Sequence, residues 1–452
     1  MKKVLLAVAS MLLLMTGMAF AEDGGLEIGL DYRFRVDSLK GTVHDYIDTG
    51  LRPGSTVGPT AGYDVKNDTI FMNRFGMHMK ANPVEDVTMK AKLDMYKISG
   101  HQTANPFMGP FFADRGEVND GTASHVPEDS IMRVDYAYAT VSNIFGAPIW
   151  YSVGRRPSTG GIPSNIRQNN EKQGTAGIPS MLVNYAFDGM TVGYAPDIDA
   201  LPGFYAKLCY GRGYESGLQA KGSGLPRDTD FYGLNSSLYD TDNLHVEIQY
   251  QLGRNIFDAP SDSAMLSTNL GNISWLGGVV MGKVNNLNLF ATAATSKTDP
   301  SGKTTMGGMA GLMNSGPVST ENHTGTAFYV GGRYDIASTG TKVGLEYNHG
   351  SKNWISMVPA EDDIWTGKLG TRGDVYEVYI IQSLNRKAIA KKGEAFIRLG
   401  YQLYNFNYTG SNNWVGAPVK ISDLNQTTAA NAQYLVPIEK ASDLFLTFDV
   451  RF

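Results

Sequence analysis

The residue types that most often carry catalysis or hold metals are scattered along this 452-residue chain. Its seven histidines show neither a His-Glu-x-x-His pair nor another spacing typical of metal ligands. The single cysteine, Cys209, excludes a disulfide framework, a Cys-x-x-Cys zinc site and a Cys-x-x-Cys-His haem attachment. Neither a Gly-x-Ser-x-Gly nucleophile turn nor a Gly-x-x-x-x-Gly-Lys-Ser/Thr phosphate loop is present. We therefore predict that the protein is not an enzyme and has no cofactor or metal.

One acidic run, Glu361-Asp362-Asp363, lies in a long predicted connection. Its carboxylates could bind a divalent cation, or bridge lipopolysaccharide phosphates through one. Charged residues are mostly exposed unless they are paired. We therefore expect this run to be a hydrated acidic loop.

Most other charged residues recur at every second position, between apolar ones. Residues 26–37 read LEIGLDYRFRVD, in which apolar side chains alternate strictly with polar or small ones. The same alternation recurs in 87–96, 132–140 and 244–252, and in the C-terminal run SDLFLTFDVRF. Such a pattern indicates strands with one dry face and one wet face. Strands of soluble proteins usually have five or six residues, so 26–37 is long for that class.

Short and long connections take turns between these strands. Lipid offers no hydrogen-bond partner, so a sheet that crosses a bilayer must close on itself. Short periplasmic turns and long extracellular loops are typical of such barrels. We predict an all-β fold for 22–452, an antiparallel up-and-down transmembrane β-barrel of about 16 strands, with 18 as the alternative. The long extracellular loops are expected near 38–69, 99–130, 157–180, 212–229, 253–272, 297–325, 351–374 and 407–442.

The strand count depends on residues 188–211. The alternating runs number about 17, whereas an even count places both chain ends at the periplasmic rim. A count of 16 results if 190–195 and 203–211 form one strand that is interrupted at 196–202. Asp188-Gly189 then marks a tight hairpin turn. A large soluble sandwich, propeller or β-helix is the alternative fold, although no repeat of 40–50 residues marks propeller blades.

The N-terminus indicates export. Residues 1–21 combine Lys2 and Lys3, an apolar stretch and the small-x-small sequence Ala19-Phe20-Ala21, as in a cleaved secretory signal peptide. The chain ends at Phe452 after an alternating strand, which resembles the assembly signal of bacterial outer-membrane proteins. The formal charge of −5 argues against a nucleic-acid partner. We therefore expect the protein in the outer membrane of a Gram-negative bacterium.

Four stretches resemble an uncharacterised family of porin-like outer-membrane proteins. They are 34–47, 72–81, 132–177 and 185–213, and the segment 151–177 carries the most specific likeness. The resemblance implies a barrel. It brings no activity and no site residues, because none is established for the family.

Residues on the wet faces of the strands should line the bore. Cations dominate the first strands and acids are frequent on later ones, which would place a basic wall opposite a more acidic wall. Opposed charge across a pore favours charged or dipolar solutes. The alternative is that these charges are simply solvated and set no selectivity. The predicted pore-lining residues are Arg33, Arg35, Arg74, Lys80, Lys90, Lys92, Arg133, Asp135, Glu247, Glu346, Glu377 and Asp449.

The third long loop, 157–180, is the candidate constriction. In general porins of 16 strands the third loop folds inward and narrows the channel. By analogy of position, Arg156, Arg167, Glu171 and Lys172 would line the narrowest point here. An ordinary surface loop is the alternative.

These observations favour a porin, a passive water-filled channel for small hydrophilic solutes. Its partners would be outer-membrane lipid, lipopolysaccharide and the solutes themselves, and a homotrimer is one arrangement that general porins adopt. The first alternative is the barrel sheath of a porin–cytochrome electron conduit, in which the multihaem cytochrome would be a separate chain. The second is a barrel enzyme, for which the sequence offers no catalytic cluster.

Overall fold

The computed structural model describes residues 25–48, 56–100, 125–127, 129–158, 161–172, 181–218, 227–257, 268–305, 310–316, 319–384, 387–389, 393–428 and 436–452. The expected signal peptide, 1–21, lies outside these residues. No helix within them is long and apolar enough to cross a membrane.

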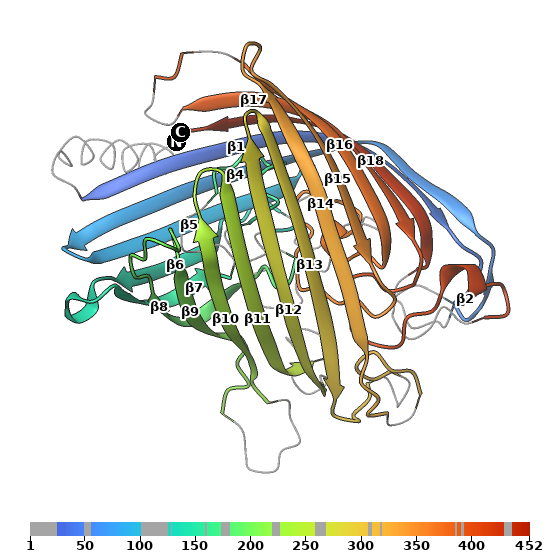
Figure 1. Cartoon of the computed structure of the whole chain (residues 1–452). Helices are drawn as coiled ribbons and strands as arrows, with labels where there is room; N and C mark the ends of the chain where they lie inside the picture. The colour runs from blue at the N-terminus through green and yellow to red at the C-terminus, as the bar shows by residue number, and fades with distance from the viewer. Residues whose placement is uncertain are drawn as a thin grey trace, which may run out of the picture.

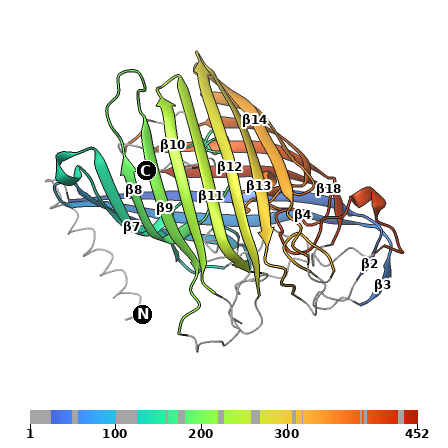
Figure 2. The same ribbon diagram turned by 60° about the horizontal axis from the view of Figure 1, so that its bottom comes forward.

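Sixteen antiparallel strands form one closed barrel, in which β1 pairs with both β4 and β18 (Figure 1). The predicted fold and strand number are therefore confirmed. The strands of opposite walls cross at a large angle, as tilted strands of a closed barrel do (Figure 2). The barrel strands are β1 (Leu26–Val43), β4 (Tyr63–Val84), β5 (Val87–Ile98), β6 (Arg133–Val141), β7 (Ile149–Pro157), β8 (Ala186–Tyr194), β9 (Tyr205–Tyr214), β10 (Thr229–Asp240), β11 (Leu244–Phe257), β12 (Asn269–Val284), β13 (Leu287–Pro300), β14 (Thr324–Ile336), β15 (Thr341–Gly350), β16 (Gly373–Ser383), β17 (Glu394–Phe406) and β18 (Ile438–Arg451).

The remaining elements are short. Strands β2 (Tyr46–Asp48) and β3 (Gly58–Thr60) pair with each other in the connection between β1 and β4, outside the barrel. The described residues also include the 3-10 turns η2 (Ile144–Gly146), η4 (Lys368–Gly370) and η5 (Ile421–Asp423).

The predicted pairing around 188–211 was wrong, although the total was right. Asp188 and Gly189 lie inside β8, and β8 pairs with β9 as a separate neighbour, with Met190 opposite Tyr210. Gly189 therefore marks a close backbone approach rather than a turn, because a Cβ there would lie 2.0 Å from the carbonyl oxygen of Tyr210. The actual turn, 195–204, contains Pro196 and Pro202, which cannot donate to a strand ladder.

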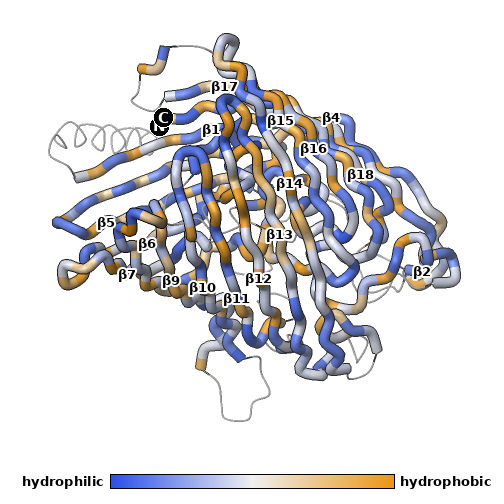
Figure 3. Tube along the Cα trace, in the orientation of Figure 1, coloured by the Kyte–Doolittle hydropathy of each residue, from blue (hydrophilic) through white to orange (hydrophobic). Residues whose placement is uncertain are grey.

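The outer face of the barrel is apolar. Hydrophilic and hydrophobic residues alternate along the strands, most visibly from β10 to β14 (Figure 3). The outward members include Leu208 and Leu345, which are 63% and 65% exposed. Exposed tyrosines such as Tyr232, Tyr334 and Tyr376 lie among them. A continuous apolar belt with interspersed aromatic residues suits acyl chains rather than water.

Candidate functional site

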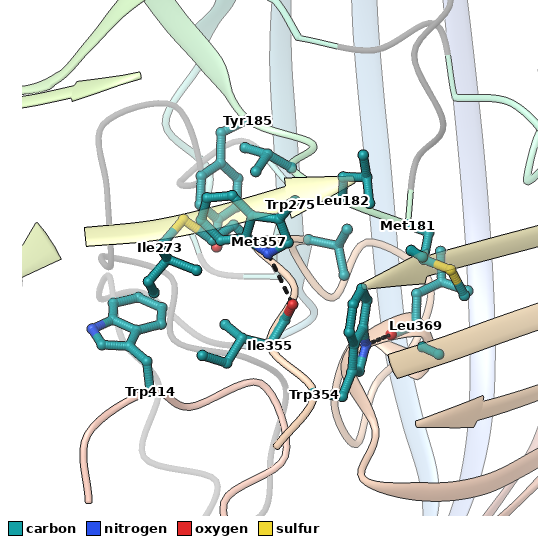
Figure 4. Close-up of a cluster of buried hydrophobic side chains, with 14 of the residues drawn as sticks. Met181, Leu182, Tyr185, Ile273, Trp275, Trp354, Ile355, Met357, Leu369 and Trp414 are labelled. Carbon is teal, nitrogen blue, oxygen red and sulfur yellow. Dashed lines mark hydrogen bonds between the residues drawn. The ribbon is translucent and has the colours of Figure 1, made fainter. Parts of the chain in front are cut away.

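The interior of the barrel is partly filled by the connections between strands. A buried cluster joins Trp275 on β12 to side chains of 181–185, 310–316, 354–358 and 414–415. Its indole groups are satisfied by backbone oxygens: Trp275 Nε1 donates to Ile355 O at 2.9 Å, and Trp354 Nε1 donates to Leu369 O at 2.7 Å (Figure 4). These segments are parts of four long connections, so the connections pack into the bore and give it a hydrophobic core.

The acidic run 361–363 also lies inside the barrel, so the expected hydrated loop was wrong. The Oδ2 atom of Asp362 lies 2.5 Å from Nη1 of Arg33 on β1 and 2.8 Å from Nη2 of Arg398 on β17. Burial would raise the pKa of the Asp362 carboxyl, but Arg33 and Arg398 outweigh it and hold this pKa well below its usual range. Asp363 pairs with Arg167 at 2.8 Å. The carboxylates are used to attach the connection to the wall.

Lys368 of η4 makes a second attachment. Its Nζ lies 2.5 Å from Glu346 on β15 and 2.7 Å from Glu377 on β16. These two glutamates are direct register partners, and like charges in that position repel. Lys368 therefore places a cation of the connection between two wall carboxylates, and Arg167 supplies a second cation to Glu377 at 3.0 Å.

The described part of the predicted constriction loop crosses the bore. Residues 161–172 form consecutive turns, with Asn165 N donating to Gly161 O and Gln168 N to Ser164 O. The last carbonyl groups of such a helical segment lack partners inside it. Three wall arginines donate to these carbonyl groups: Arg333 to Ile166 O, Arg398 to Arg167 O, and Arg451 to Gln168 O and Asn169 O. A fourth wall cation, Lys342, donates to the side-chain oxygen of Asn169.

A third charged group lies on β5 and β6. Lys92 on β5 pairs with Asp94 and with Asp135 of β6, at 2.5 and 3.2 Å. His125 lies 2.7 Å from Asp135 and 3.6 Å from Glu361. Burial disfavours the charged imidazole, but Asp135 and Glu361 outweigh it and raise the pKa of His125 to about 10. The imidazolium links this wall to the connection that carries Asp362.

The predicted pore-lining residues lie on the inner face, and most form ion pairs. Arg33 pairs with Asp449 and Arg35 with Asp443, while Glu247 accepts a hydrogen bond from His245. Arg74 lies 3.9 Å from Asp31, Lys80 lies 3.0 Å from Glu27, and Arg133 lies 2.9 Å from Asp129. Within the described ranges, the predicted residues without an ion pair are Lys90, Arg156 and Glu171.

A chamber of about 1550 Å³ remains inside the barrel. Short-turn residues 240–243 and 393–394 line one part of it, and 164–172 and 358–361 line another. Glu171 and Lys172 both face it, and Lys172 is ion-paired with Asp240. Within the described residues, no group of three or more His, Cys, Asp or Glu side chains is arranged to hold a metal ion. The chamber is therefore lined by charged residues of both signs, some of which are ion-paired with one another.

Sequence comparison places the chain in a family. Residues 64–452 match the family described as "Protein of unknown function (DUF3373)". The chain belongs to this family. The predicted resemblance to an uncharacterised family is thus confirmed, although the stretch 34–47 precedes the matched residues. Among curated proteins, no sequence match to this DUF3373 member was found.

Several solved structures have a similar fold at low sequence identity. The OmpT outer-membrane protein of Vibrio cholerae in its trimer form is 12% identical, with a TM-score of 0.43 over 95% of this chain and all of the other. OmpF of Salmonella typhi in complex with daunomycin is 10% identical, with a TM-score of 0.46 over 95% and 99%. An anion-selective porin from Comamonas acidovorans is 10% identical, with a TM-score of 0.45 over 95% and 99%.

The attachment residues of the inner connections were not foreseen. Lys368 and the carbonyl groups of 166–169 have no sequence motif, because their partners lie on distant strands. A signal was nevertheless present in WISMVPAEDDIW, 354–365, which is unusually apolar for a loop in water. Trp354, Ile355 and Ile364 are fully buried in the structure. An apolar loop between two barrel strands thus indicates an inward fold.

Proposed function

We propose that the protein is an outer-membrane porin, a passive channel for small hydrophilic solutes. The observation that carries this proposal is a charged chamber inside a closed barrel whose outer face is apolar. A polar bore surrounded by an apolar belt is the arrangement that lets ions and polar molecules cross a bilayer. The short turns would face the periplasm and the long connections the cell exterior.

The inner connections support a narrow channel rather than a wide one. The segments 161–172 and 354–369 occupy space that a barrel of 16 strands would otherwise leave to water. We infer that solutes are small and pass between charged side chains. The same segments occupy the space that a haem protein would need, which counts against the electron-conduit alternative.

Ion conduction in planar bilayers tests the proposal. Refolded full-length protein should produce stepwise current increases in symmetric KCl, whereas heat-unfolded protein should not. Folding is checked first by the heat-dependent mobility shift that closed barrels show on gels. Correctly folded protein that inserts into the bilayer but carries no current would contradict the channel function.

A further inference from the structure

Two of the inner-wall cations predicted from the sequence differ from the rest of that set. Lys90 on β5 and Arg156 on β7 have neither an ion pair nor a hydrogen bond to any carboxylate in the described part of the chain. Arg33, Arg35, Arg74, Lys80, Lys92 and Arg133 each face a carboxylate. Uncompensated cations are costly in a protein interior unless a mobile anion can reach them.

The local field at Lys90 is positive. Lys90 and Lys80 are direct register partners on β5 and β4, a position in which like charges repel. Lys90 is also the register partner of Tyr138, whose ring centre lies 5.2 Å from the guanidinium carbon of Arg156. Glu27 is ion-paired with Lys80, and its side chain remains 72% exposed. The wall therefore holds more positive than negative charge at this point.

Aromatic rings hold the Arg156 side chain in place. Its guanidinium carbon lies 5.2 Å from the ring centre of Tyr138 and 5.4 Å from that of Trp150. The Trp150 ring lies against Gly193 of β8, where a Cβ would be 2.1 Å from a ring atom. Rings orient a guanidinium but do not neutralise it. Arg156 Nε is buried and has no hydrogen-bond partner, so this N–H is unsatisfied.

We propose that Lys90, Tyr138, Trp150 and Arg156 form a binding site for small organic carboxylates. This inference rests on the channel function proposed above and names the solute class. A guanidinium matches a carboxylate with two parallel N–H bonds, and the Lys90 ammonium adds a second charge. The rings offer an apolar surface for the hydrocarbon part of the solute. The ring centres of Tyr138 and Tyr136 are 5.8 Å apart, and Tyr136 lines the chamber. The site is therefore next to the proposed solute path through the chamber.

Ligand-observed NMR on the folded full chain in detergent tests the site. Benzoate should give saturation-transfer signals that saturate with concentration. Benzyl alcohol has the same ring without the charge. It should bind at least about ten-fold more weakly, because one charge-assisted hydrogen-bonded pair is lost. Arg156→Gln should weaken benzoate binding by roughly the same factor. Arg155→Gln is the matched control, because Arg155 is the adjacent residue and pairs instead with exposed Asp188.

Lys90→Gln gives an independent test if Arg156→Gln fails to fold, because Lys90 is exposed in the bore. This variant should also weaken benzoate binding. Equal binding of benzoate and benzyl alcohol, or unchanged benzoate binding in the folded variants, would overturn the site. The measurement needs no membrane current. Conduction without benzoate binding therefore rejects only the site, and benzoate binding without conduction rejects only the channel.

Discussion

On the wall formed by β14 to β18 and β1, buried charges are matched by residues of the inner connections, whereas on β5 and β7 two cations stay unmatched. Arg33 and Arg398 share Asp362, and Glu346 and Glu377 share Lys368. Lys90 and Arg156 have no such partner in the described residues. On the first wall, ion pairs hold the inner connections in place. On β5 and β7, the unmatched cations are free to bind a solute. A row of inward cations in a sequence can therefore mean either role.

Neutralising Asp362 should disturb the matched wall most. In Asp362→Asn, Arg33 and Arg398 lose the carboxylate they share, and breaking a buried ion pair costs roughly 3–5 kcal/mol. We expect a lower temperature for the gel mobility shift and a larger single-channel conductance as 361–363 detaches. Asp68→Asn is the control, because Asp68 and its partner Lys66 are 67% and 69% exposed. If both variants behave alike, the connection is not held by these charges.

Removing one cation from the carbonyl groups of 166–169 should have a smaller effect. Arg333→Gln loses the bond to Ile166 O and the pair with Asp335. A hydrogen bond from a charged group contributes roughly 1.5–3 kcal/mol. We expect faster proteolytic cleavage within 161–172, mapped by mass spectrometry, while the barrel strands stay protected. Cleavage at the wild-type rate would mean that the remaining three cations hold the segment without Arg333.

The pH response of His125 tests the contact between β6 and the connection that carries Asp362. Its pKa in the folded protein, about 10, exceeds the unfolded value of about 6.5. The stabilisation from its charge is therefore complete below pH 6.5 and is lost as the pH rises through 10. Chemical unfolding should become easier over this range, and His125→Gln should flatten the change. A variant that keeps the full pH dependence would assign it to another group.

The fold could be predicted because alternation records, residue by residue, which side of a strand is dry. The strand pairing near 188–211 could not be predicted in this way. Asp188-Gly189 has the sequence of a tight turn, but Gly189 lies within a strand, where it allows the neighbouring backbone to come close. Short-range sequence rules do not distinguish these two uses of glycine.

The interior was less predictable than the wall. The inner face of each strand follows from its period, so Arg33, Lys90 and Arg156 could be expected in the bore. Which of them would be neutralised could not, since Asp362 lies 329 residues from Arg33 along the chain. Only the apolar residues around Asp362 hinted that its loop folds inward.

The separation of Arg33 from its partners has a consequence for biogenesis. The first strand carries arginines whose carboxylates, Asp362, Asp443 and Asp449, belong to the last part of the chain to be made. A sheet that entered the bilayer strand by strand would leave Arg33 without its carboxylates, and Arg35 with Asp37 of its own strand alone. We expect instead that insertion, seating of the inner segments and closure of the β1–β18 seam occur as one late cooperative step.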